Sequence, residues 1–236
     1  MKQDIIVTIH QPESYPWYGF FNKMYNCDKY IILDSVDFRK NYFQNRNKIL
    51  TNNGESYLTI PIRKGDSKKI KDIEIVSNSA WNKKHWQTIL QSYKKSPYFH
   101  EIESELFKVI SNGAEKLVEY NLNIISLFKD KLGFKCDLLL SSDLNIEAKS
   151  SDLILEICKA TDATTYISGK DGANYLNEKD FNEESISVKF QNFKIEEYSQ
   201  FNSNGNFVPY MSVIDLISNI GIEKTREYII KGWSVK

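Results

Sequence analysis

The chain has little of several features that would assign it to a class at once. Its 236 residues include three cysteines, Cys27, Cys136 and Cys158, which are widely spaced and form no CxxC pair. This is neither the spacing of a zinc site nor a secreted disulfide framework, so we expect reduced thiols that fill the core, and no metal. No apolar run approaches the roughly 18 residues of a membrane helix, and polar Gln3 and Asp4 interrupt any signal-peptide pattern. We therefore expect a soluble, cytoplasmic protein without a membrane partner.

An excess of charge of one sign is also absent. Lys and Arg together number 31, as do Asp and Glu, so no general field attracts nucleic acid, and we expect no specific nucleic-acid partner. The sequence also lacks the GxGxxG fingerprint, the P-loop and the GxSxG nucleophile elbow. What remains is 41% hydrophobic residues and a high aromatic fraction of 13%, enough for one sizeable core.

The first thirty residues indicate a parallel sheet. Residues 5–9 are apolar except for Thr8 and predict a buried strand, Pro16 predicts the beginning of a helix, and 30–33 predict a second strand. Strand, helix and strand at this spacing form a βαβ unit with parallel strands. Ligands bind at the carboxyl ends of such strands, which places His10 and Gln11 at a binding edge. Asp34 and Asp37 follow the second strand, so we expect their turn to face the His10 turn across a crevice.

The later pattern predicts an α/β fold with an insertion. Residues 48–51 and 57–62 flank Asn53-Gly54, which is a strong hairpin signal, and 72–76 predict a short strand. Three helices are expected at 80–95, with Ser79 as the N-cap, at 98–111 and at 114–131, followed by strands at 138–140, 164–167 and 186–190. We therefore expect a Rossmann-like, mainly parallel sheet with a β-hairpin and a helical insertion, in one domain spanning 1–236, with the helical excursion at about 79–132.

Three further groups of residues could bind a ligand, and each has a plain structural alternative. The segment 38–48 carries Gln44, Asn45 and Arg46 among other cations and amides, which suits a nucleotide or sugar phosphate, or is a solvated basic turn. Trp81, Lys84 and His85 share one helix face, which could close onto an anion or be an amphipathic rim. The turn at 168–172 resembles a phosphate loop only loosely and could be a tight turn. His10 itself could be a backbone-bonded histidine at a strand end.

Taken together, these motifs resemble a known family. His10-Gln11-Pro12, Tyr15-Pro16-Trp17, Gly19-Phe20-Phe21 and Lys23 are similar to the opening of the WbqC-like protein family. The resemblance continues through Asp34, Asp37-Phe38, Gln44-Asn45-Arg46, Trp81, Lys84-His85, Tyr93, Pro97-Tyr98, Ser168-Gly169 and Tyr175-Leu176. Glu13-Ser14 before Tyr15, and Asp37 where the family pattern has glutamine, depart from it mildly.

The resemblance implies a role around nucleotide-activated sugars, because the family is named for a gene of bacterial O-antigen and lipopolysaccharide clusters. Our leading hypothesis is an N-acyl or aminoacyl transferase, or an ATP-dependent amide ligase, acting on a nucleotide-linked amino sugar with an acyl or aminoacyl donor. The alternatives are a non-catalytic nucleotide-sugar binding protein and a glycosyltransferase. A weaker likeness to adenylate-forming nucleotidyltransferases leaves the use of ATP with Mg open. The oligomeric state stays open as well.

The same hypothesis assigns roles to individual residues. The catalytic candidates are His10, His85 and Lys84. The substrate-binding candidates are Gln11, Trp17, Gly19, Lys23, Asp34, Asp37, Gln44, Asn45, Arg46, Trp81, Tyr93, Ser168, Gly169 and Tyr175.

Overall fold

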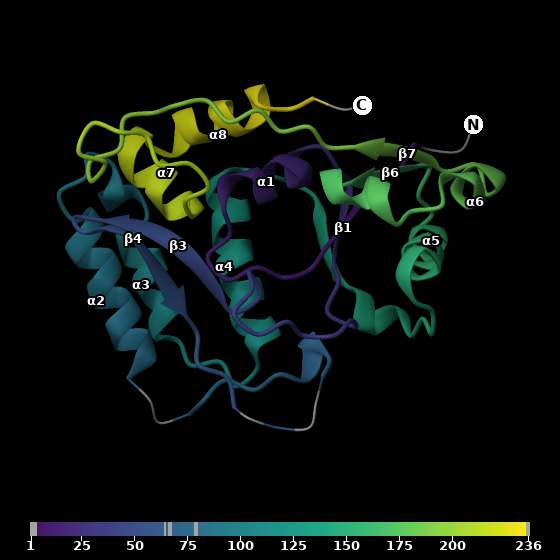
Figure 1. Cartoon of the computed structure of the whole chain (residues 1–236), viewed down its shortest axis with the longest axis horizontal. Coiled ribbons are helices and arrows are strands. Elements are labelled where there is room, and N and C mark those ends of the chain that lie inside the picture. The colour runs from purple at the N-terminus through teal and green to yellow at the C-terminus, as the bar shows by residue number, and fades with distance from the viewer. Residues whose placement is uncertain (1–3, 64, 66–67, 78–79, 235–236) are drawn as a thin grey trace.

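A five-stranded parallel sheet organises the fold and lies toward the right in Figure 1. The computed structural model describes residues 4–63, 65, 68–77 and 80–234. Within these, five strands lie in the order β5-β2-β1-β6-β7, with all neighbours parallel. Their bounds are β1 (Ile6–His10), β2 (Lys29–Ile32), β5 (Asp137–Leu140), β6 (Thr165–Ser168) and β7 (Ser187–Phe190). The chain adds β2 and β5 on one side of β1 and then crosses to add β6 and β7 on the other. The predicted α/β class with a mainly parallel sheet is confirmed.

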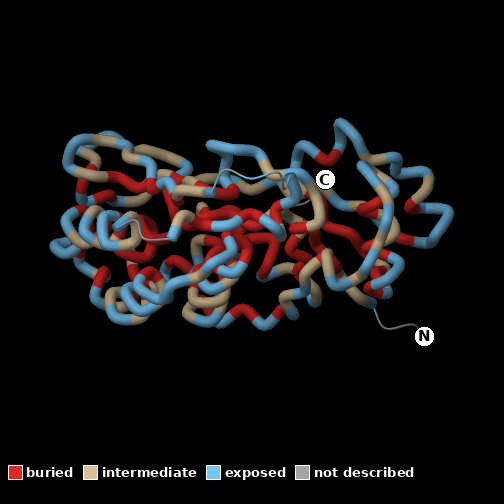
Figure 2. The backbone as a smooth tube through the Cα atoms, turned by 90° about the horizontal axis from the view of Figure 1, so that it is seen from below, coloured by how far each residue is buried: buried red, intermediate tan, exposed pale blue. Residues whose placement is uncertain are grey.

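Helices cover both faces of this sheet. The larger core contains side chains of α1 (Tyr18–Tyr25), α4 (Leu117–Lys131) and α8 (Ile222–Lys231), and the smaller one those of α5 (Ser150–Ala160) and α6 (Glu178–Glu183). Alternate residues of β2 point to opposite faces, so that Tyr30 and Ile32 enter the larger core and Ile31 the smaller. Figure 2 shows the buried segments as a band along the long axis, with exposed segments on the outside. None of the helices among the described residues is long and apolar enough to cross a membrane.

The crossing from β2 to β5 carries the hairpin and the helical excursion. Strands β3 (Arg46–Thr51) and β4 (Gly54–Thr59) pair antiparallel as a separate sheet, which confirms the predicted hairpin. Helices α2 (Trp81–Tyr93), α3 (Glu103–Ser111) and α4 confirm the three predicted helices. The predicted strand at 72–76 is wrong, because this segment makes only isolated bridges, such as Ile75 with Ile62. The proposed cap Ser79 lies outside the described residues.

The helix expected from Pro16 begins later. Helix α1 starts at Tyr18, because the Pro16 carbonyl accepts a hydrogen bond from the Val213 amide and Trp17 forms a backbone bridge with Ser212. These contacts keep residues 16 and 17 extended and bind them to the beginning of α7 (Val213–Ile220).

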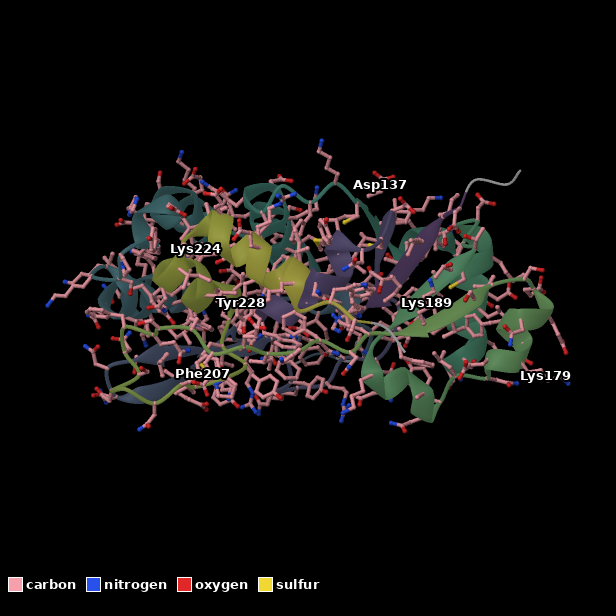
Figure 3. All side chains as sticks on the ribbon, turned by 90° about the horizontal axis from the view of Figure 1, so that it is seen from above. Asp137, Lys179, Lys189, Phe207, Lys224 and Tyr228 are labelled. Carbon is pink, nitrogen blue, oxygen red and sulfur yellow. The ribbon has the colours of Figure 1, made fainter. Side chains whose placement is uncertain are left out.

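A long irregular segment joins β7 to α7. Residues 192–211 contain neither helix nor strand and run along one side of the molecule (Figure 1). Seen from above, the segment carries Phe207 past the α8 helix that bears Tyr228 (Figure 3). The buried Asp215 carboxylate fixes it by accepting hydrogen bonds from Tyr198 Oη at 2.6 Å and Gln200 Nε2 at 2.9 Å. The segment therefore brings side chains from near the C-terminus to the side of α1.

Candidate functional site

A cleft of about 600 Å3 opens at the carboxyl ends of β1 and β6. Between these two strands the strand order reverses, and open α/β sheets bind ligands at this point because the loops after the strands diverge there. Most of its lining comes from four segments, at 9–23, 39–44, 169–175 and 191–195, together with Tyr210. The cleft therefore combines the beginning of the chain with segments more than 150 residues away.

His10 is the last residue of β1 and lines the cleft. Its Nδ1 lies 2.8 Å from the Gln11 carbonyl oxygen. A carbonyl can only accept, so Nδ1 carries the proton and Nε2 keeps its lone pair. The Phe20 ring packs edge-on at 5.1 Å. Burial, helped by the charge of Lys23, lowers the pKa of His10 to about 3, so the imidazole is neutral at physiological pH.

Glu13 and Lys23 complete what we call the His10–Glu13–Lys23 cluster. Glu13 Oε1 lies 3.9 Å from His10 Nε2, and Lys23 reaches the cleft from α1 while only 2% exposed. Burial raises the pKa of Glu13 to about 8 against the opposing charge of Lys23, and burial lowers the pKa of Lys23 to about 8 against the charge of Glu13. At neutral pH the cluster therefore contains a neutral imidazole, a neutral carboxyl group and one ammonium group.

Two amides next to the cluster hold each other in place. Gln44 Nε2 donates to Gln11 Oε1 at 2.7 Å, and Gln44 Oε1 accepts from the Arg39 amide at 2.6 Å. Both glutamines line the cleft. Because the Gln11 oxygen accepts this bond, its NH2 group is the end that a ligand can meet.

Aromatic rings form one wall and much of the rim. Trp17 lies against Phe193 and Tyr210, each at a centroid distance of 5.7 Å. Gly19 leaves room for the indole, since a Cβ there would lie 2.1 Å from the Trp17 ring. Further half-exposed rings at the rim are Tyr42, Phe43 and Tyr175, beside the exposed cations Arg39 and Lys170. Such a rim can stack on a planar or sugar ring and hold a phosphate.

Eight of the residues predicted from the sequence line this cleft together. They are His10, Gln11, Trp17, Gly19, Lys23, Gln44, Gly169 and Tyr175.

The turn at Asp34 does not face His10 across the cleft, contrary to expectation. The Asp34 carboxylate accepts hydrogen bonds from the Ser141 hydroxyl at 3.0 Å, the Ser142 amide at 2.9 Å and the Ser142 hydroxyl at 2.8 Å. It therefore joins the carboxyl ends of β2 and β5. Asp37 is exposed and makes a backbone bridge with Lys69. The neighbour of β1 across the cleft is β6, on the opposite side from β2.

His85 and Trp81 lie behind the loop that carries Glu13, not in the cleft. His85 Nε2 donates to the Thr59 carbonyl at 3.2 Å, so Nδ1 accepts from Tyr15 Oη at 2.9 Å. Burial lowers the pKa of His85 to about 4. Trp81 packs against the His85 ring at 5.1 Å, and Lys84 is exposed on the same helix. This group supports Tyr15, whose φ of 47° is uncommon for a large side chain.

The other predicted residues outside the cleft have contacts of their own. The Arg46 guanidinium lies 4.5 Å from the centroid of the Tyr57 ring, and Asn45 donates to the Ile60 carbonyl at 3.1 Å. Tyr93 donates to Asp215 at 3.0 Å. Ser168 is buried at the end of β6, where a Cβ on Gly172 would lie 1.9 Å from its hydroxyl oxygen.

Sequence reasoning missed Glu13, Gln191, Phe193 and Tyr210 as members of the site. Glu13 had a usable signal, because it follows His10 by three residues in the loop between strand and helix. Gln191 directly follows β7, and Phe193 and Tyr210 lie on the irregular segment 192–211, whose course no local pattern predicts. Within the described residues, no group of three His, Cys, Asp or Glu side chains is arranged to hold a metal ion.

Fold and cleft together define a doubly wound α/β protein with a cleft at the reversal of its strand order. The chain belongs to the WbqC-like protein family, whose sequence model matches residues 11–227. It is also similar to the uncharacterized protein Rv1507c of Mycobacterium tuberculosis (strain ATCC 25618 / H37Rv), with 29% identity over 221 residues, which cover 92% of this chain and 94% of that protein. No solved structure matches the chain.

Proposed function

We propose that this protein is an enzyme of bacterial surface-polysaccharide (O-antigen) biosynthesis that transfers an acyl or aminoacyl group to the amine of a nucleotide-linked amino sugar. Membership of the WbqC-like family supports the biosynthetic setting. The observation that carries the reaction class is His10, a neutral imidazole whose unprotonated Nε2 lies in a cleft beside a buried ammonium group. An amine that attacks an acyl carbon has to lose a proton, and a positioned histidine is the usual acceptor.

The cluster supplies the two things that this attack needs. The first is a cation: the buried ammonium group of Lys23 stabilises the negative charge that develops on the acyl oxygen during the attack. Such charge is stabilised most strongly in a site that excludes water. The Lys23 charge also depresses the pKa of His10. A negatively charged substrate offsets that charge, which removes the smaller of the two causes that lower the pKa of His10, the larger being burial.

The outer cleft suits the nucleotide-sugar part of the substrate. The Gln11 NH2 group can donate to sugar hydroxyls, and the rings of Trp17 and Tyr210 offer an apolar wall. Arg39 and Lys170 at the rim can bind phosphate oxygens. Of the catalytic residues predicted from the sequence, this scheme uses His10 and leaves out His85 and Lys84.

The test is an assay of the purified protein by mass spectrometry. Nucleotide-linked amino sugars are incubated with acyl donors offered in parallel: free acids with ATP and Mg, acyl thioesters and aminoacyl donors. Addition of an acyl mass to an intact nucleotide sugar is the expected result. Release of free nucleoside diphosphate would indicate a glycosyltransferase, and binding without any product would indicate a binding protein.

A histidine variant completes this test. His10→Gln keeps the side-chain volume but removes the base, so turnover is expected to fall by about 100-fold or more while the unfolding midpoint stays unchanged. Full turnover by His10→Gln would contradict the proposed role of the imidazole.

A further inference from the structure

Two polar atoms at the inner end of the cleft have no hydrogen-bond partner among the described residues. They are Lys23 Nζ and Glu13 Oε2, both on side chains that line the cleft and are almost completely buried. Folded proteins leave few buried polar groups unpaired, because each such group loses its hydration without compensation. A ligand in the cleft could therefore supply the hydrogen-bond partner that each of these two atoms lacks.

Lys23 and Glu13 do not form a direct ion pair with each other. Lys23 and Glu13 influence each other electrostatically, yet within the described residues no nitrogen–oxygen contact of 4.0 Å or less joins them. The 3.9 Å from His10 Nε2 to Glu13 Oε1 is also too long for a hydrogen bond. No direct contact among these three side chains therefore satisfies Lys23 Nζ or Glu13 Oε2, although all three residues line the same cleft.

The charge of this inner end is one positive unit at neutral pH. The other titratable groups that face the pair are His10 and Cys27 beside Lys23, and Tyr30 beside Glu13. Burial keeps all three neutral by lowering the pKa of His10 and raising those of Cys27 and Tyr30. A buried charge without a partner is costly. One negative charge from a ligand would compensate it.

We propose that the inner end of the cleft binds a carboxylate group, with Lys23 Nζ donating to one of its oxygens and the Glu13 carboxyl group donating to the other. A carboxylate carries the single negative charge and the two acceptor oxygens that this pair of donors requires. A phosphate would bring a second charge, and His10 Nε2 adds no donor for its further oxygens. If the proposed function holds, this carboxyl group belongs to the acyl donor. Only that assignment rests on the proposed function; the binding of a carboxylate does not.

The experiment compares propionate with its neutral analogue propionamide and with inorganic phosphate at constant ionic strength and about pH 6.5. Binding is measured by the rise in unfolding temperature and by broadening of the ligand NMR lines. Lys23→Met, which exchanges a buried ammonium for an apolar chain of similar length, is expected to fold and to weaken propionate binding by about tenfold or more. Glu13→Gln retains a donor and is expected to stay within about threefold of wild type. Lys40→Met is the control, because it removes the same charge from an exposed residue outside the cleft.

The pH dependence adds a second readout. At about pH 9 Glu13 is ionised and repels a carboxylate, while Lys23 has lost its proton, so affinity for propionate is expected to fall by about tenfold or more relative to pH 6.5. The proposal is overturned by any of three results. These are that wild type does not bind propionate, that propionamide or phosphate binds as tightly as propionate, or that Lys23→Met binds propionate as tightly as wild type. Binding is measured without turnover, so a failed transferase assay with intact propionate binding removes only the assignment to the acyl donor.

Discussion

Replacing Glu13 by glutamine tests the protonation state on which the site depends. Burial raises the pKa of this carboxyl group from 4.5 to about 8. Between these values the folded protein holds a proton that the unfolded chain has released, so the associated stability is present below pH 4.5 and is lost as the pH rises toward 8. Glutamine has nearly the same shape as glutamate and cannot ionise, so the Glu13→Gln variant does not lose this stability as the pH rises.

The magnitude can be worked out for a window in which Glu13 dominates the cluster. Below pH 6.5 His10 has the opposite effect on stability, because its pKa is lowered from 6.5 to about 3. Above pH 8 Lys23 also has the opposite effect, because its pKa is lowered to about 8. One proton changes the free energy of unfolding by about 1.4 kcal/mol per pH unit, so wild type is expected to lose about 2 kcal/mol between pH 6.5 and 8 relative to Glu13→Gln.

Urea unfolding followed by circular dichroism at closely spaced pH values measures this difference. Titrating groups outside the His10–Glu13–Lys23 cluster are common to both proteins and cancel in the comparison. Glu197→Gln, at an exposed position, is the matched control and should run parallel to wild type. Parallel curves for wild type and Glu13→Gln from pH 6.5 to 8 would refute the reasoning, because Glu13 would then be ionised in the folded protein throughout.

Three further substitutions test other parts of the structure. Gly19→Ala places a methyl group against the Trp17 ring, so ligand binding in the cleft should weaken by about tenfold as measured by titration calorimetry; unchanged affinity would show that the indole position does not matter. Asp34→Ala removes the acceptor of three hydrogen bonds and should cost about 3 kcal/mol in urea unfolding while propionate binding persists; loss of binding in a folded variant would place the Asp34 turn in the site after all. Lys23→Met should raise the free energy of unfolding at pH 7 by about 1 kcal/mol or more, because it removes an uncompensated buried charge; destabilisation would indicate that the ammonium group has a partner.

The local parts of the fold could be predicted because their signals are local. The apolar run before His10, the Asn-Gly hairpin and the helical periodicities of α2 and α4 each depend on a few neighbouring residues, and the structure confirms those elements. The beginning of α1 was misplaced by two residues, because Pro16 and Trp17 bind the distant beginning of α7. Tertiary contacts of this kind leave no trace in local sequence.

The candidate site was predictable only in the half that is close in sequence. The loop after β1 and the beginning of α1 carry their own signal, and five predicted residues from 10–23 line the cleft. The choice of Asp34 as the facing turn assumed that the nearest strand in sequence supplies the other wall. Strand order decides this, and the order β2-β1-β6 places the second wall at Gly169. Tyr210 is on no regular element, so neither periodicity nor strand order indicated it.

The pairing of β1 with β6 also bears on how the protein acquires its cleft during folding. The Thr8 hydroxyl donates to the Ile167 carbonyl, 159 residues further along, and Tyr210 closes the wall later still. Contacts between such distant parts of a chain form slowly, because a large loop has to close first. A growing chain therefore cannot form the complete cleft until almost all of it has been synthesised. A ligand that fills the cleft favours the final docking step, and its presence should raise the yield of refolded protein.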